Sequence, residues 1–169
     1  VVDAASKGAI DGLGLVLNIA AIILAFVALI ALVNGLIGWI GGWFGFSNLS
    51  LQTILGYIFA PVAAIIGVPW GESVLAGSLI GQKIILNEFV AFTSMSPLLP
   101  ELSAKTTAIV TFALCGFANI SSIAILIGGI GGMAPNRKHD IARLGWKAVL
   151  GGTLANLLSA TIAGLLLTI

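Results

Sequence analysis

The chain has 169 residues, of which 59% are hydrophobic and only 8% charged, and its mean hydropathy is +1.18. Soluble domains carry about 25% charged residues, so the composition excludes an ordinary soluble domain. No charged residue occurs in 12–71, 106–136 or 148–169, and each gap exceeds the roughly 20 residues that a helix needs to cross a bilayer. The net charge of +1, without a basic stripe, gives no sign of a nucleic-acid partner. The sequence therefore predicts an all-α integral membrane protein.

The first part of the chain is predicted to form two helical segments. Residues 1–13 carry their apolar side chains on one helical face and their charged side chains on the other, which favours a helix lying at the membrane surface. Residues 14–44 form an apolar run longer than a bilayer needs, and this predicts a long, tilted spanning helix. Trp39 and Trp43 lie near its end, where aromatic side chains prefer the membrane interface.

The middle of the chain is predicted to contain a short helix and a re-entrant hairpin. Residues 50–68 are apolar, contain Pro61 and are short for an upright span. Residues 70–95 comprise two short apolar pieces, "ESVLAGSLIG" and "EFVAFTSM", on either side of "QKIILN". Neither piece is long enough to cross a bilayer, and both carry charge. Two half-length helices joined by a polar tip form a re-entrant hairpin, which is tolerated where the tip is buried in protein or lines a wet cavity.

The last third of the chain is predicted to contain two spanning helices. Residues 103–130 form a spanning helix that is broken at "CGFANISS", and residues 141–169 form the last one. The glycines of "GGIGG" either permit close helix contacts or belong to a loop, and the sequence leaves both readings open. Basic residues cluster in 131–147, so the bias of Lys and Arg toward cytoplasmic loops places this loop inside the cell and the C-terminus outside.

An acidic residue, Glu88, stands inside the apolar stretch "IGQKIILNEFVAF", with Asn87 beside it. Ionisable residues at membrane depth cost about 2.5–3.5 kcal/mol on insertion scales and are functional hypotheses by default. We therefore interpret Glu88 as a ligand-binding carboxylate. Alternatively, Glu88 pairs with Lys83 and only pins the hairpin, although a spacing of five residues places the two on different helical faces. Lys83 itself is expected to extend to water at the tip.

A second polar interruption is "GFANISS", at 116–122. Asn119 and Ser122 are three residues apart and are expected to project from one helical face, with Phe117 as an apolar wall nearby. They could instead bond only to neighbouring helices or to their own backbone. A carboxylate on a hairpin tip opposite a broken helix with an amide and a hydroxyl is typical of a transporter site near the bilayer midplane. The ligand implied is small, polar and neutral, with hydroxyls that donate to the carboxylate.

Other polar residues give little sign of enzymatic chemistry. No His/Cys cluster has metal-ligand spacing, and no phosphate-binding G-x-x-x-x-G-K-[ST] occurs, so the chain is not predicted to be an enzyme and no covalent cofactor is expected. His139 is interpreted as a solvated loop residue and Cys115 as a small packing residue within a helix. Glu72 is expected to begin the first half-helix of the hairpin, where the helix dipole favours a carboxylate.

Two motifs resemble a known family. The stretch "GQKIILNEFVA", from Gly81 to Ala91, contains the whole signature Gly/Ala-x-Lys-x-x-x-Asn-Glu-Phe-Val-Ala of the concentrative nucleoside transporters. The stretch "GFANISS", followed by "PNRKHD", is similar to a further block of that family and comes in the expected order. The chain thus resembles the family over essentially its whole length.

The resemblance implies a symporter that moves nucleosides into the cell with a sodium or a proton gradient. It implies a homotrimer in the cell membrane and a fold of two inverted repeats, each with a re-entrant hairpin and a partly unwound helix. It also implies that Glu88, Asn119 and Ser122 hold the ribose, with Phe117 beside them and Asn87 next to the carboxylate.

The chain departs from the family in length. Members are more than twice as long, and this sequence begins without a methionine or a signal-peptide pattern. It is therefore expected to be the C-terminal half, without the hairpin that reads the base and without most of the sodium site, and no residue is assigned to an ion here. Two alternatives remain: a carrier or channel for another small polar solute or a cation, and a structural membrane subunit with an internal Glu88–Lys83 pair.

Overall fold

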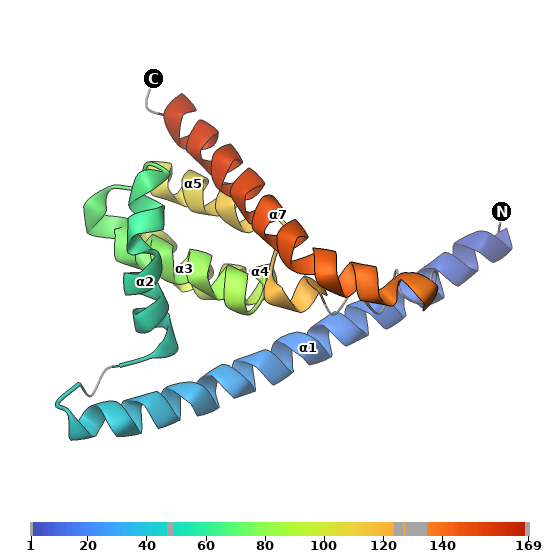
Figure 1. The fold of residues 1–169 in the computed structure, drawn as a ribbon, viewed down its shortest axis with the longest axis horizontal. Helices are drawn as coiled ribbons and strands as arrows, with labels where there is room; N and C mark the ends of the chain where they lie inside the picture. Colours follow the sequence, from blue (N-terminus) through green and yellow to red (C-terminus); the bar gives the residue numbers. More distant parts are fainter. Residues whose placement is uncertain (1, 47–48, 124–126, 128–134, 168–169) are drawn as a thin grey trace. The chain divides into compact units, whose positions relative to one another are not determined.

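The computed structural model describes residues 2–46, 49–123, 127 and 135–167, and within them all regular structure is helical, as the sequence predicts. The chain divides into two compact units, Val1–Asn48 and Leu49–Ile169. The main helices, labelled in Figure 1, are α1 (Val2–Trp43), α2 (Leu51–Ile65), α3 (Ser73–Ile85), α4 (Glu88–Met95), α5 (Ala104–Leu114) and α7 (Lys138–Leu166). Three short 3-10 helices, η1 (Trp70–Glu72), η2 (Ser96–Glu101) and η3 (Pro135–Arg137), accompany them.

The first unit is built on α1, a single helix of 42 residues. It runs without interruption through the two segments that the sequence divides at residue 13, so the surface position of 1–13 stays a prediction. The helix ends where Gly45 takes a φ of 81° and the Phe46 N–H donates to the Gly41 carbonyl at 2.8 Å. Only a residue that tolerates a left-handed backbone closes a helix in this way, which explains the glycine.

Two stretches of helix among the described residues are long and apolar enough to cross a membrane. They are Leu24–Trp43, with a mean hydropathy of 2.2, and His139–Leu166, with a mean hydropathy of 1.7. Helices α2 and α5 are apolar but shorter. The first stretch ends with Trp39 and Trp43, whose rings meet edge to face at 4.7 Å between centroids.

The second unit begins with a close crossing of α2 and α3, which Figure 1 shows running steeply across each other. Small residues make the approach possible. A Cβ added at Gly77 would lie 2.6 Å from the Ala60 nitrogen and 2.7 Å from the Gly56 oxygen, both of which are backbone atoms of α2. In membranes, association of helices has no hydrophobic driving force, because lipid tails are as apolar as the side chains. Small residues at the contact instead let the two backbones pack closely, as they do here.

We expect the substitution Gly77→Ala to destabilise the protein by about 2 kcal/mol, because the new methyl group must push two helix backbones apart. Gly151→Ala on α7 is the matched control, since nothing lies within 4 Å of a Cβ built there. Thermal unfolding of the full-length protein in detergent should show a lower midpoint for the first variant alone. Equal midpoints for both variants would mean that the crossing is looser than the structure shows.

Helices α3 and α4 form the helical hairpin expected from the sequence, with Leu86 and Asn87 as the tip. A buried side chain of α3, Gln82, ties the two arms together. Its Nε2 donates to Ser78 Oγ at 3.1 Å, and its Oε1 accepts from Ser94 Oγ of α4 at 2.8 Å. Both polar ends of this amide are therefore satisfied inside the unit. The position of the hairpin in the membrane stays a prediction.

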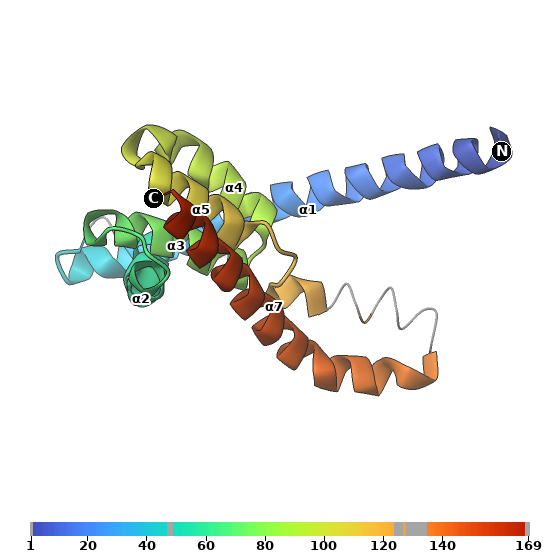
Figure 2. The ribbon, with the colours of Figure 1, turned by 90° about the horizontal axis from the view of Figure 1, so that it is seen from above.

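Helix α5 and the long α7 complete the unit, and Figure 2 shows α7 lying along α5. Ile109 of α5 and Ala160 of α7 are fully buried, and a Cβ at Gly164 would lie 2.7 Å from the Ile109 side chain. The core joins these helices to α2, α3 and α4 through Ala63, Ile66, Val68, Ala76, Leu79, Ile80, Ala91, Met95, Leu102, Ile109, Val110, Ala113, Leu114 and Ala160. The hairpin is thus packed on a fixed framework.

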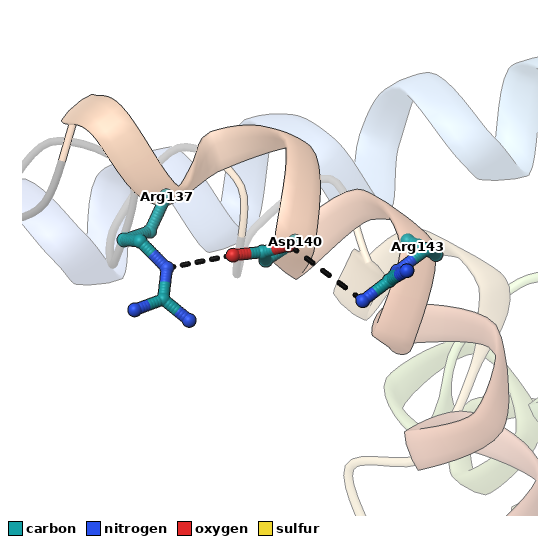
Figure 3. A network of polar contacts seen from close by, with 3 residues as sticks. All are labelled: Arg137, Asp140 and Arg143. Carbon is teal, nitrogen blue, oxygen red and sulfur yellow. Dashed lines mark hydrogen bonds and ion pairs between the residues drawn. The ribbon is translucent and has the colours of Figure 1, made fainter.

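Arg137 and the first turns of α7 form a network of exposed charges, drawn in Figure 3. Asp140 Oδ2 lies 2.6 Å from Arg137 Nε, and its Oδ1 lies 3.8 Å from Arg143. Exposed pairs of this kind contribute little to stability. His139 lies in the first turn of α7 and not in a loop, which corrects the expectation for its backbone, although its side chain is exposed as expected. The "GGIGG" glycines lie outside the described residues.

Glu72 begins the hairpin, as the sequence suggests, because it is the N-cap residue of α3, although its side chain makes no capping hydrogen bond there. Its Oε2 instead accepts from the N–H and the hydroxyl of Ser103, at 3.1 and 3.0 Å, at the start of α5. Hydrogen bonds from Thr106 and Ser103 stabilise the carboxylate and lower the pKa of Glu72 below its ordinary value. The base of the hairpin is therefore fastened to α5.

This fastening should weaken in acid. A carboxyl whose pKa is lower in the folded protein stabilises it above the ordinary pKa of about 4.3, and this contribution disappears as the pH falls through the folded-state value. We expect the wild type to unfold at a higher temperature than Glu72→Gln at neutral pH, and the two midpoints to converge below about pH 4. Thermal unfolding in detergent across this range measures the gap, and a gap independent of pH would contradict the assignment.

Candidate functional site

The hairpin tip presents a carboxylate at the start of a helix. Asn87 caps α4, because its Oδ1 accepts the N–H of Val90 at 2.9 Å. Glu88 is the first residue of α4, where the unpaired N–H groups and the helix dipole favour a negative charge. The Glu88 side chain is only 8% exposed, so it stands in a largely enclosed place and needs polar partners.

The predicted break after α5 ends in a second capped helix. Helix α5 stops at Leu114, and helical structure begins again at Ile120. Asn119 caps this new start: its Oδ1 accepts the N–H of Ser122 at 2.8 Å, while Ser122 Oγ accepts the N–H of Asn119 at 3.1 Å. Such a reciprocal pair is a capping box. The spacing of three residues therefore serves the cap and not a shared helical face.

The two helix starts are joined by one short hydrogen bond. Asn119 Nδ2 donates to Glu88 Oε2 at 2.7 Å, across 31 residues of sequence. The amide has a defined orientation, because its Oδ1 already accepts from the Ser122 N–H and from the Ser121 hydroxyl at 2.7 Å. The same Ser121 hydroxyl lies 3.2 Å from the carbonyl oxygen of Leu86 at the hairpin tip. The break is thus held against the tip by side chains from both.

This geometry leaves one acceptor open. Oε2 of Glu88 is occupied by Asn119, and this is the one hydrogen bond that the Glu88 carboxylate makes within the described part of the chain, so Oε1 has no partner there. The hydroxyl of Ser122 donates to the Asn119 carbonyl at 2.6 Å, so this serine fixes the cap and is not a free donor. Glu88 can therefore accept a hydrogen bond from a ligand hydroxyl without losing its internal partner.

A cavity of about 260 Å³ adjoins the break. Phe117, which is 57% exposed, and Ser122 belong to its wall. Asn156 of α7 also lines it, and the buried Nδ2 of this amide has no hydrogen-bond partner among the described residues. The Asn156 side chain lies directly against Gly116, where no Cβ would fit. The lining residues are Gly116, Phe117, Ala118, Ser122, Ala148, Val149, Gly152 and Asn156.

Of the residues singled out in the sequence, Glu88, Asn87, Asn119 and Ser122 come together at the tip and the break, and Phe117 lies beside them at the cavity. Ser121 and Asn156 were not singled out. The sequence could have pointed to Ser121, because it is a hydroxyl within "GFANISS". For Asn156 the sequence offered only an isolated amide in an otherwise apolar helix. Both residues contact residues that are distant in sequence, so their roles could not be predicted from local sequence.

Two further expectations are wrong. Lys83 was expected to extend to water, but it is buried in the unit, with 1% of its surface exposed. It also makes no ion pair with Glu88, because the ion pairs found among the described residues both involve Asp140. Cys115 was expected to pack within a helix, but it caps the end of α5 and is exposed. Within the described ranges no group of three or more His, Cys, Asp or Glu side chains could hold a metal ion.

Comparison with known proteins gives a consistent result. A family model described as "Na+ dependent nucleoside transporter C-terminus" matches residues 1–164. The "Uncharacterized transporter YutK" of Bacillus subtilis is 61% identical over 98% of this chain and 41% of its own length. The "Nucleoside permease NupC" of Helicobacter pylori is 52% identical over 97% of this chain and 40% of its own length. These relatives are described as transporters and not as enzymes, in agreement with the prediction from the sequence.

Solved structures extend the likeness to the fold. The structure of CNTnw in an inward-facing substrate-bound state matches 97% of this chain and 41% of its own chain, with a TM-score of 0.94 and 57% identity. A CNTnw variant in an outward-facing state matches 99% of this chain and 41% of its own, with a TM-score of 0.96 and 55% identity. The chain spans about 41% of the length of these proteins. It belongs to the concentrative nucleoside transporter family and corresponds to the C-terminal part of its members.

Proposed function

We propose that this chain is the C-terminal half of a cation-coupled symporter that carries nucleosides into the cell, and that it supplies the part of the site that binds the ribose. Sodium is the coupling ion that the family description names, and a proton gradient is the alternative. Most of the ion site would lie in the half of the transporter that precedes this chain. The protein is proposed to be a homotrimer in the cell membrane, with 131–147 cytoplasmic and the C-terminus outside.

The observation that carries the proposal is the hydrogen bond between Asn119 and Glu88. It fixes one carboxylate oxygen and leaves the other open at a place where the hairpin tip meets the break. Neighbouring hydroxyls, as on a ribose ring, are suitable donors to such a carboxylate, and a hydroxyl–carboxylate bond is about twice as strong as a neutral one. Glu88 would accept from the ribose, and Asn119 would hold Glu88 in place.

The other site residues have supporting roles in this proposal. Ser122 would maintain the cap that orients the Asn119 amide, with a remaining lone pair available to the ligand. Asn87 would maintain the start of α4 on which Glu88 stands. Phe117 would give an apolar wall beside the ribose. Transport would follow if the ligand binds the outward- and inward-facing states with different affinity, because only differential affinity shifts such an equilibrium.

The proposal is tested by uptake of radiolabelled uridine into liposomes that contain the full-length protein. We expect an inward sodium gradient to accelerate uptake, and unlabelled nucleosides, but neither free ribose nor amino acids, to compete. If a proton gradient accelerates uptake and a sodium gradient does not, the coupling ion is the proton and the rest of the proposal stands. Absence of uridine uptake under both gradients would overturn the proposal and favour another solute.

A further inference from the structure

Lys83 is the charged group that the site described above does not use. It lies in the last turn of α3, two positions before the end of the helix, with 1% of its surface exposed. Its Nζ is buried and has no hydrogen-bond acceptor among the described residues. Lysines are almost never fully buried without a partner, because an isolated ammonium in an apolar interior is very unfavourable. A buried lysine in this position requires a compensating charge.

Glu88 is the residue that can compensate it. Lys83 and Glu88 lie on opposite sides of the hairpin tip, on α3 and on the first turn of α4. Burial disfavours the charged form of Lys83, and the negative charge of Glu88 across the tip favours it. The two side chains make no direct ion pair, since the ion pairs found among the described residues both involve Asp140. In a medium of low dielectric constant, charges interact appreciably without contact.

We propose that Lys83 is a positioning residue for the Glu88 carboxylate: its ammonium supplies the compensating charge while remaining out of hydrogen-bond contact. This inference rests on the proposed function of Glu88 as the ribose acceptor. A direct ion pair would occupy the carboxylate oxygens, whereas compensation through space leaves Oε1 open to a ligand. The carboxylate can therefore be buried and still have an oxygen free to accept from a ligand. A direct ion pair that only holds the hairpin together would leave no such oxygen.

A double-mutant cycle on the full-length protein tests this inference. The variants are Lys83→Met, Glu88→Gln and the two together, with Lys147→Met as the control because this lysine is exposed on α7. We expect Lys83→Met alone to lower the midpoint of thermal unfolding by about 5 °C or more, since it leaves a buried carboxylate without compensation. The double variant should be more stable than the sum of the single effects, because it removes both charges.

Transport kinetics separate positioning from mere stabilisation. In liposomes, folded Lys83→Met is expected to raise the KM for uridine about tenfold with a smaller change in the maximal rate, and Lys147→Met is expected to leave both unchanged. Additive losses of stability in the cycle, or an unchanged KM in Lys83→Met, would overturn the inference. If Lys83→Met does not fold, folding of the double variant supports it and failure of both contradicts it. A wild type without uridine uptake would refute the proposed function, and the unfolding cycle would still decide on charge compensation.

Discussion

Replacement of Glu88 by glutamine should reduce the apparent affinity for uridine by about 100-fold while the protein remains folded. The amide keeps the length and shape of the side chain, and its oxygen can still accept from Asn119 Nδ2, as Oε2 of the carboxylate does at 2.7 Å. It loses the negative charge that accepts ligand hydroxyls. With that oxygen facing Asn119, the glutamine presents its NH2 group to the ligand and the open acceptor is lost. Hydrogen bonds to charged groups contribute about 1.5–3 kcal/mol each, and a loss of roughly 2.7 kcal/mol corresponds to about 100-fold in affinity.

The measurement is uridine uptake by the full-length protein in liposomes, with KM and maximal rate determined separately. Glu101→Gln is a matched control, because that carboxylate is exposed at the end of η2 and belongs to no part of the site. It should behave as the wild type. A Glu88→Gln protein with wild-type KM would show that the carboxylate does not contact the ligand. Size-exclusion chromatography of each variant establishes that the comparison concerns folded protein.

The positions of the hairpin and of the break could be predicted because polar residues interrupt apolar runs there. Glu88 and the "GFANISS" stretch are costly at membrane depth, so their presence already indicated a site. The sequence predicted that Glu88 and Asn119 lie near each other, but it did not predict the hydrogen bond between them. No local rule gives a contact across 31 residues, since it depends on how the hairpin packs against α5.

A sequence-based prediction also failed where one residue spacing is compatible with two structures. Asn119 and Ser122 are three residues apart, which fits both a common helical face and a capping box. The second explanation holds because the chain leaves the helix after Leu114 and starts a new one at Ile120. The position of Glu72 at the start of α3 could be predicted, but its two donors on Ser103, also 31 residues away, could not. Caps follow from local sequence only where no distant partner competes.

The strongest test of the joined helix starts is the substitution Asn119→Asp. Aspartate caps helices as well as asparagine does, so the acceptance of the Ser122 N–H at 2.8 Å should survive. The donor to Glu88 is lost, and two carboxylates then face each other where the Nδ2–Oε2 distance is 2.7 Å. Repulsion between largely buried like charges is severe, so we expect a loss of stability of about 3 kcal/mol or more and no measurable uridine uptake.

A second substitution separates this contact from the cap. In the double variant Asn119→Asp with Glu88→Gln, the glutamine amide can donate to the new carboxylate, which restores one hydrogen bond with the direction of donation reversed. Thermal unfolding should therefore return most of the lost stability. Uridine uptake should remain well below that of the wild type, because the glutamine oxygen that then faces the ligand is neutral and a weaker acceptor than the carboxylate. Recovery of both properties would show that any polar link between tip and break suffices, and recovery of neither would place the effect of Asn119→Asp in the cap itself.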